Sequence, residues 1–255
     1  MSAKSDPFFH VFARNISNTE VPAELAFVVN GIPHPLCFEA TQLLQEHLKL
    51  QDDWSHNFGL DPEHPGAVIG KMFGVLVVRN LMGELGYLAA FSGKLAGRNT
   101  HHEFVPPVYD LLQTDGFLTP GMLELGEINA KIKLLKEEDP VKNKPGIDAL
   151  KSQRMMHSYQ LQQRIFDQYT FLNKAGESKS LRELFLKARN TRPPAGAGEC
   201  AAPKLLQYAW AHGYEPLALA EFWWGLSPKS ATWKHGEYYA CCKEKCEPIL
   251  RYMLA

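Results

Sequence analysis

The chain lacks the features that would place it in a membrane or on a secretion route. No apolar run in its 255 residues reaches the length of a membrane-spanning helix, about 20 residues. The N-terminal segment MSAKSDPFFHVF has no apolar core of the kind found in signal peptides. Five cysteines, an odd number with two of them adjacent, do not indicate a secreted disulfide framework. We therefore expect a cytoplasmic protein with reduced thiols and no membrane-embedded part.

The chain also lacks an excess of charge of either sign. Its 27 Lys and Arg residues nearly balance its 28 Asp and Glu residues, which leaves a net charge of −1. No global positive field would attract nucleic acid, so binding to RNA would need a local basic patch. The hydrophobic content of 45% is typical of a globular protein with a buried core.

Two of the cysteines lie where helices are expected to begin. Cys200 and Cys246 each precede an apolar, helix-like run, and each run has a proline near its start, Pro203 or Pro248. Proline fits the first turn of a helix, where a missing N–H costs nothing. Because unpaired N–H groups and the helix dipole favour an anion there, both positions would stabilise a thiolate.

Cys200, Cys242 and Cys246 are the candidate ligands of a metal ion, for which zinc is the first choice. Three protein ligands with an open fourth position would suit a catalytic zinc, whereas a fourth ligand such as Cys241 or His235 would make it structural. Two alternatives remain open. The cysteines are ordinary reduced thiols of a core, or Cys200 is a nucleophile with a histidine partner that no spacing selects.

The apolar pattern predicts a β-hairpin and several helices. The strand FGVLVV is almost continuously apolar, so we expect it at the centre of a sheet that is covered on both faces. Periodicity and turn residues predict helices at 38–50, 122–135, 147–172 and 180–189, and strands at 73–78, 85–91 and 217–224. These elements predict an α/β fold, or an α+β fold, in one domain spanning 1–255. A central mixed sheet would carry a helical insertion at 120–192, which we call the helical arm.

Four basic residues are candidates for binding RNA phosphates. Lys94 and Arg98 lie in the glycine-rich segment SGKLAGR after the second strand, Lys71 precedes the first strand, and Arg154 lies on the helical arm. Backbone N–H groups and these side chains would hold a phosphate, although the segment is not a known P-loop and also fits a turn with solvated charges. The helical arm would contact either RNA phosphates or a partner helix.

Without the arm, the order of elements is β–β–α–β–α, which resembles the zinc-dependent cytidine deaminase superfamily. The resemblance implies that Cys200 is the first zinc ligand and that Cys242 and Cys246 are the cysteine pair. Two features depart from that family. The pair is spaced C-x3-C instead of C-x2-C, and Ala202 stands where the family has its catalytic glutamate. Glu199, on the other side of Cys200, is the candidate general acid and base.

A closer resemblance covers most of the chain, from about residue 55 to its end. The strings IGKMFGVLVV, GELGYLAAFSGKLAG, PPAGAGECAAPKLLQYA and KHGEYYACCKEKCEPIL resemble the N-terminal extension of bacterial RluA-like RNA pseudouridine synthases. The resemblance implies an RNA-modification setting in the bacterial cytoplasm, with ribosomal or transfer RNA as partner. The HRLD-type motif of the synthase is absent, because no Arg-Leu-Asp occurs, so we do not expect this chain to isomerise uridine.

These observations predict an accessory, RNA-associated domain of a pseudouridine synthase-like protein, built around a structural zinc. The alternative is a deaminase-like, zinc-dependent hydrolase that acts on a base or nucleotide. A second alternative is a protein-interaction module that docks through the helical arm.

Overall fold

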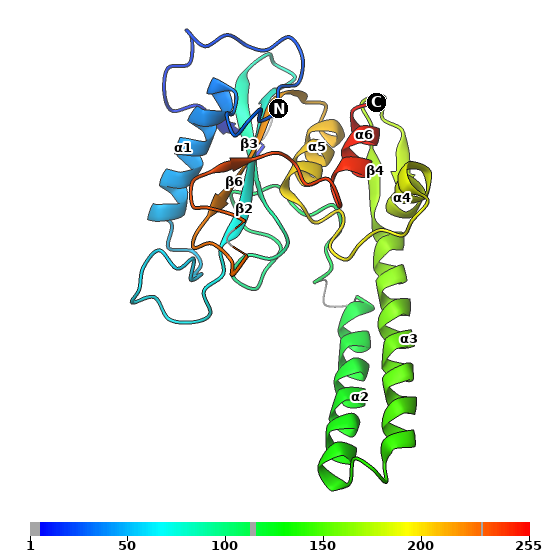
Figure 1. Cartoon of the computed structure of the whole chain (residues 1–255). Helices are drawn as coiled ribbons and strands as arrows, with labels where there is room; N and C mark the ends of the chain where they lie inside the picture. The colour runs from blue at the N-terminus through cyan, green and yellow to red at the C-terminus, as the bar shows by residue number, and fades with distance from the viewer. Residues whose placement is uncertain (1–5, 113–115, 231) are drawn as a thin grey trace. The chain divides into compact units, whose positions relative to one another are not determined.

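The computed structural model of the chain describes residues 6–112, 116–230 and 232–255, which form two compact units (Figure 1). The first unit combines the chain up to Val108 with Thr170–Ala255, and the second, which we call the helical unit, is Tyr109–Tyr169. The first unit packs helices on a five-stranded sheet, which confirms the expected α/β or α+β class. None of the helices in the described ranges combines the length and apolar character needed to cross a bilayer.

The sheet of the first unit is antiparallel at every pairing between its strands, instead of mixed as expected. Its strand order is β1 (His10–Val11), β3 (Leu85–Phe91), β2 (Lys71–Arg79), β6 (Glu215–Trp224) and β7 (Tyr238–Tyr239). β3 and β6 both pair antiparallel with β2, one on each side, so these two strands run in the same direction without being neighbours. The direction of β6 depends on the long crossover that precedes it, which local sequence does not encode.

β2 lies at the centre of the sheet, as its apolar sequence predicts, and helices cover both of its faces. Phe73, Val75 and Val77 pack in one core with α1 (Pro35–Leu50). Gly74 faces the opposite side, towards α5 (Ala201–Ala211), and Figure 1 shows α1 and α5 on opposite sides of the sheet. This alternation follows from the two-residue period of a strand.

The three C-terminal helices begin close to where the sequence predicts. Cys200 is the N-cap of α5, and Cys246 is the N-cap of α6 (Glu247–Met253). The helix α4 (Leu181–Arg189) starts with a capping box in which Ser180 and Glu183 satisfy each other's backbone N–H groups. α4 packs on α6, so it belongs to the first unit, although the expected insertion ran from 120 to 192.

The helix expected at 147–172 ends earlier than predicted. α3 (Lys144–Gln168) stops before Tyr169, whose side chain is buried. The next residues form β4 (Thr170–Leu172), which pairs with β5 (Ser178–Ser180) in a separate two-stranded sheet. Tertiary pairing therefore overrides the helical periodicity of this segment.

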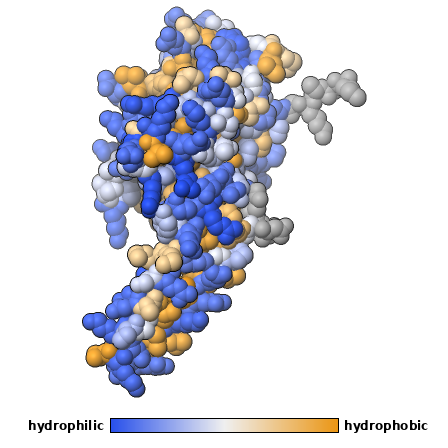
Figure 2. All heavy atoms as spheres, turned by 90° about the vertical axis from the view of Figure 1, so that its right-hand side faces the viewer, coloured by the Kyte–Doolittle hydropathy of each residue, from blue (hydrophilic) through white to orange (hydrophobic). Residues whose placement is uncertain are grey.

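The helical unit consists of α2 (Leu118–Glu138) packed on α3. Its core is small and centres on Ile128, Ile132 and Ile147. Figure 2 shows apolar residues in orange among the polar surface of this unit. Such exposed apolar side chains are the feature that the protein-interaction hypothesis requires, and they include Met122, Leu123, Leu134, Met155 and Met156.

Candidate metal centre

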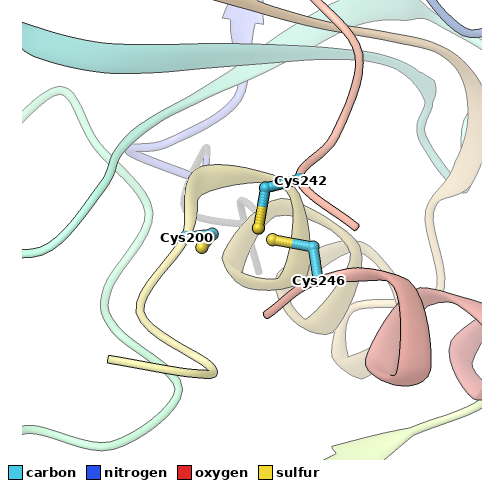
Figure 3. Close-up of side chains that lie close together, drawn as sticks. All are labelled: Cys200, Cys242 and Cys246. Carbon is cyan, nitrogen blue, oxygen red and sulfur yellow. The ribbon is translucent and has the colours of Figure 1, made fainter. Parts of the chain in front are cut away.

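The Sγ atoms of Cys200, Cys242 and Cys246 lie within 4.8 Å of one another, and Figure 3 shows the three side chains converging. In a tetrahedral zinc site with Zn–S bonds of about 2.3 Å, the sulfur atoms are about 3.8 Å apart. A small inward movement of the sulfurs therefore completes three corners of such a site. The structure thus brings together all three predicted ligands in a group that can hold a metal ion.

Glycines and backbone hydrogen bonds shape the loop that delivers Cys200. Gly196 and Gly198 have φ angles of 74° and 90°. Residues with a side chain rarely adopt such angles, so these glycines allow the PPAGAGEC segment to turn sharply before α5. The Ala201 N–H, in the first turn of α5, donates to Ser92 Oγ at 3.2 Å. The Gly93 N–H donates to the carbonyl of Glu199 at 2.9 Å. The start of α5 is therefore bonded to the segment that follows β3.

The backbone from Cys242 to Cys246, the C-x3-C segment, forms a single turn. The N–H groups of Cys246 and Glu247 both donate to the carbonyl of Cys242 at 3.2 Å. The Lys245 N–H donates to the Cys242 Sγ at 3.3 Å. Residues four apart lie on the same side of a helical turn, so this spacing brings both sulfurs to one side at the start of α6.

Hydrogen bonds among the three thiols favour a negative charge on Cys242. Hydrogen bonds from the Cys200 and Cys246 thiols, together with the Lys245 and Cys246 N–H groups, lower the pKa of Cys242 well below its ordinary value. The hydrogen bond to Cys242 raises the pKa of Cys200, and hydrogen bonds to both partners raise the pKa of Cys246. Binding a divalent cation here would release the remaining thiol protons, because a metal takes thiolates as ligands.

Glu221 is a buried carboxyl beside this cluster that the sequence analysis missed. It lies in the middle of β6, and only 4% of its surface is exposed. Its Oε1 accepts a hydrogen bond from the Ala202 N–H at 3.1 Å, and its carboxylate accepts another from the Cys241 thiol. Burial raises the pKa of Glu221 to about 7. The one sequence signal was a single acidic residue inside the apolar strand LALAEFWW.

Neither of the two predicted fourth ligands belongs to the group of three sulfurs. The Cys241 thiol is engaged with Glu221. His235 accepts a hydrogen bond at Nδ1 from the Gly225 N–H at 3.1 Å, and its ring packs against Trp224 with the ring centres 4.4 Å apart. Within the described ranges, the group contains no fourth Cys, His, Asp or Glu.

Glu199, the predicted acid and base, lies next to Cys200 but is not part of the group either. Its negative charge instead acts on two partly or fully buried lysines. Burial lowers the pKa of Lys204 to about 8 and also lowers that of Lys71, whereas Glu199 opposes both shifts. The Lys204 Nζ donates to the carbonyl of Phe91 at 2.8 Å. Lys204 therefore fixes α5 to the end of β3.

The predicted phosphate-binding residues are divided between the two units. Lys71, at the start of β2, and Lys94 and Arg98, in the segment after β3, belong to the first unit. Paired backbone hydrogen bonds between Leu95 and Arg98, of 2.7 and 2.9 Å, hold this segment in a tight turn. Arg154 belongs to the helical unit, where it donates to Asn129 Oδ1 at 2.9 Å.

The candidate metal centre is built from one stretch of the chain, residues 200–247. Its three sulfurs, its buried carboxyl and its helix starts are all contributed by the C-terminal segment and β6. No protein-family model, no curated protein and no solved structure matches the chain.

Proposed function

We propose that the first unit is a zinc-binding accessory domain that associates with RNA, as part of a pseudouridine synthase-like RNA-modification protein. The observation that carries the proposal is the convergence of Cys200, Cys242 and Cys246 at the starts of α5 and α6. Thiolates are soft ligands that favour zinc, and sites with three or four cysteines are common among zinc proteins. When bound, zinc would cross-link the loop before α5 to the turn before α6.

The residues on either side of Cys200 are hydrogen-bonded to the residues just before the candidate RNA-binding segment. The loop that carries Cys200 receives a hydrogen bond from Gly93, and Ser92 accepts one from the first turn of α5. Lys94 and Arg98 follow directly in the chain. A metal that fixes the Cys200 loop would therefore also restrict the segment that presents these two cations. The sequence resemblance supplies the RNA setting.

The first experiment measures zinc content and RNA binding on the same preparations. We expect about one equivalent of zinc in the purified, reduced protein and little in a Cys200→Ser variant. Cys241→Ser is the matched control, because it removes a neighbouring thiol outside the group, and it should retain zinc. RNA binding, measured by the anisotropy of a labelled single-stranded oligonucleotide, should weaken in Cys200→Ser and not in Cys241→Ser. A parent protein without zinc, or RNA binding that is absent in all three proteins, would refute the proposal.

The alternative, a zinc-dependent hydrolase acting on a base or nucleotide, gains support from Glu221. In the deaminase pattern a glutamate stands two residues after the first ligand, at the position of Ala202. Here the Ala202 N–H binds the carboxylate of Glu221, so an acidic group from β6 reaches the same turn of α5. With its pKa raised to about 7 by burial, Glu221 is suited to give and take a proton near neutral pH.

Chromatography of nucleosides and nucleotides incubated with the zinc-loaded protein tests the alternative. A hydrolase should release product, and Glu221→Gln should abolish the activity even at zinc concentrations that keep the site loaded. Glu199→Gln distinguishes the two carboxyl groups. If Glu221 is the general acid and base, removal of the Glu199 carboxyl should leave turnover unchanged. Absence of product with every substrate would leave the accessory-domain proposal as the interpretation of the site.

A further inference from the structure

A hollow in the first unit combines aromatic walls with hydrogen-bonding groups. It has a volume of about 540 Å³, and none of the three cysteines lines it. This size is within the range of small-molecule binding sites. Its lining includes Phe8, His47, Asp53, Trp54, Arg98 and Phe104. The hollow therefore joins Arg98, one of the predicted phosphate-binding residues, to aromatic rings.

The aromatic walls are held in place by their neighbours. The backbone of Trp54 exchanges two hydrogen bonds with the Gln51 side chain, at 3.2 and 3.3 Å. Its ring packs against His101 with the ring centres 5.2 Å apart. Phe104 is buried and contacts Phe91, with ring centres 5.2 Å apart. A ligand that stacks on the Trp54 ring would meet a surface that needs little ordering.

His47 offers an unpaired polar atom at this hollow. Its Nε2 is buried and has no hydrogen-bond partner among the described residues. Buried polar atoms are nearly always paired, so the unpaired atom of a residue that lines a hollow leaves room for a partner supplied by a ligand. Burial also lowers the pKa of His47, which keeps the ring neutral and able to donate or accept.

The charged groups of the lining are of both signs. Arg98 is exposed and is held by the Leu95–Arg98 turn, so it can meet an anion at the edge of the hollow. The carboxylate of Asp53 can accept hydrogen bonds from an amino group. Glu103 is engaged with His10 and His102, at 3.4 and 3.0 Å. The lining therefore fits a flat, polar ring that carries an anionic group.

We propose that this hollow binds one nucleotide of single-stranded RNA, an inference that rests on the proposed RNA association and makes it specific. The base stacks on Trp54, its polar edge meets His47 and Asp53, and its phosphate meets Arg98. Aromatic side chains that stack on unpaired bases are the common means of binding single strands. A base held in this way provides the partner that His47 Nε2 lacks.

Calorimetry with the four ribonucleoside monophosphates on the zinc-loaded full chain tests the proposal. Ribose 5-phosphate and inorganic phosphate are the matched probes without a base. We expect at least one nucleotide to bind at least tenfold more tightly than ribose 5-phosphate. Trp54→Ala should weaken nucleotide binding tenfold or more, and Trp233→Ala, outside the hollow, should not. His47→Phe keeps a planar ring without Nε2 and should also weaken it, with circular dichroism confirming the fold of each variant.

Other results overturn the proposal or its premise separately. Equal affinity for ribose 5-phosphate and nucleotides would reduce the hollow to a phosphate site and overturn the inference. RNA binding that is insensitive to Trp54→Ala, with no mononucleotide binding, would also overturn it while leaving the proposed function intact. Binding of a basic peptide in place of nucleotides would assign the hollow to a protein partner. Trp54-dependent nucleotide binding without any RNA binding would refute the proposed function and retain a free-nucleotide site.

Discussion

The carboxylate of Glu221 accepts a hydrogen bond from the backbone N–H of Ala202 at 3.1 Å, and so joins β6 to the first turn of α5. The same carboxylate accepts a hydrogen bond from the Cys241 thiol. One buried side chain is thus bonded to both cysteine-bearing segments, two residues after Cys200 and directly before Cys242. Partners of this kind orient the ligands of a metal site and tune its affinity.

Replacing Glu221 should therefore change zinc affinity without removing a ligand. Glu221→Gln keeps an oxygen for the Ala202 N–H, and we expect zinc affinity to fall about tenfold. Glu221→Leu leaves that buried N–H unpaired, so it should also destabilise the fold by about 1–3 kcal/mol. Competition with a chromogenic chelator measures the affinity. Glu215→Gln, an exposed position on the same strand, is the control, and an equal loss there would rule out a specific role for Glu221.

The raised pKa of Glu221 predicts a pH dependence of stability in the metal-free protein. Its pKa is about 7 in the folded state and near its ordinary value of 4.5 in the unfolded chain. Between these values the folded state keeps the proton that the unfolded state has lost. Stability should therefore fall as the pH rises from about 4.5 to about 7, by about 3 kcal/mol at most.

Thermal unfolding at several pH values measures this effect, with Glu221→Gln as the reference because glutamine does not titrate. The melting temperature of the parent protein should fall relative to that of the variant as the pH rises through this window. Parallel pH profiles for the two proteins would contradict a raised pKa at Glu221.

Gly74 determines how closely α5 approaches the sheet. A Cβ atom at this position would lie 2.9 Å from the Cβ of Ala201 and 3.1 Å from the Cδ1 of Leu205. We expect Gly74→Ala to push the start of α5 away, to destabilise the protein by about 1–3 kcal/mol and to weaken zinc binding. Gly126→Ala, in α2, meets nothing within 4 Å and serves as the control. Normal zinc affinity in Gly74→Ala would show that Cys200 tolerates movement of the helix.

The sequence predicted the helix starts at Cys200 and Cys246 because their determinants are local. A proline in the first turn and the apolar run behind it mark both positions. The role of Glu221 could not be predicted, because its hydrogen-bond partners come from other segments of the chain. The face of the sheet on which its side chain lies also depends on the register of β6. Likewise, the antiparallel direction of β6 and the strand β4 depend on tertiary pairing and not on propensity.

The Lys94–Arg98 segment should contribute to RNA binding mainly through charge. For single strands, each phosphate contact adds about 0.7 to the slope of log affinity against log salt concentration. A Lys94→Ala/Arg98→Ala double variant should therefore bind more weakly at low salt and reduce the slope by about 1.4. The slope comes from anisotropy titrations of a labelled oligonucleotide at increasing salt.

The Arg154→Ala variant tests whether the helical unit also contacts RNA phosphates. If it does, the slope should fall by about 0.7, because one phosphate contact is lost. The hydrogen bond from Arg154 to Asn129 gives the side chain a structural role as well, so Asn129→Ala is the matched control. It removes the same hydrogen bond but keeps the positive charge, and the slope should stay unchanged. An unchanged slope in Arg154→Ala would confine the phosphate contacts to the first unit, where hydrogen bonds join Ser92 and Gly93 to the start of α5.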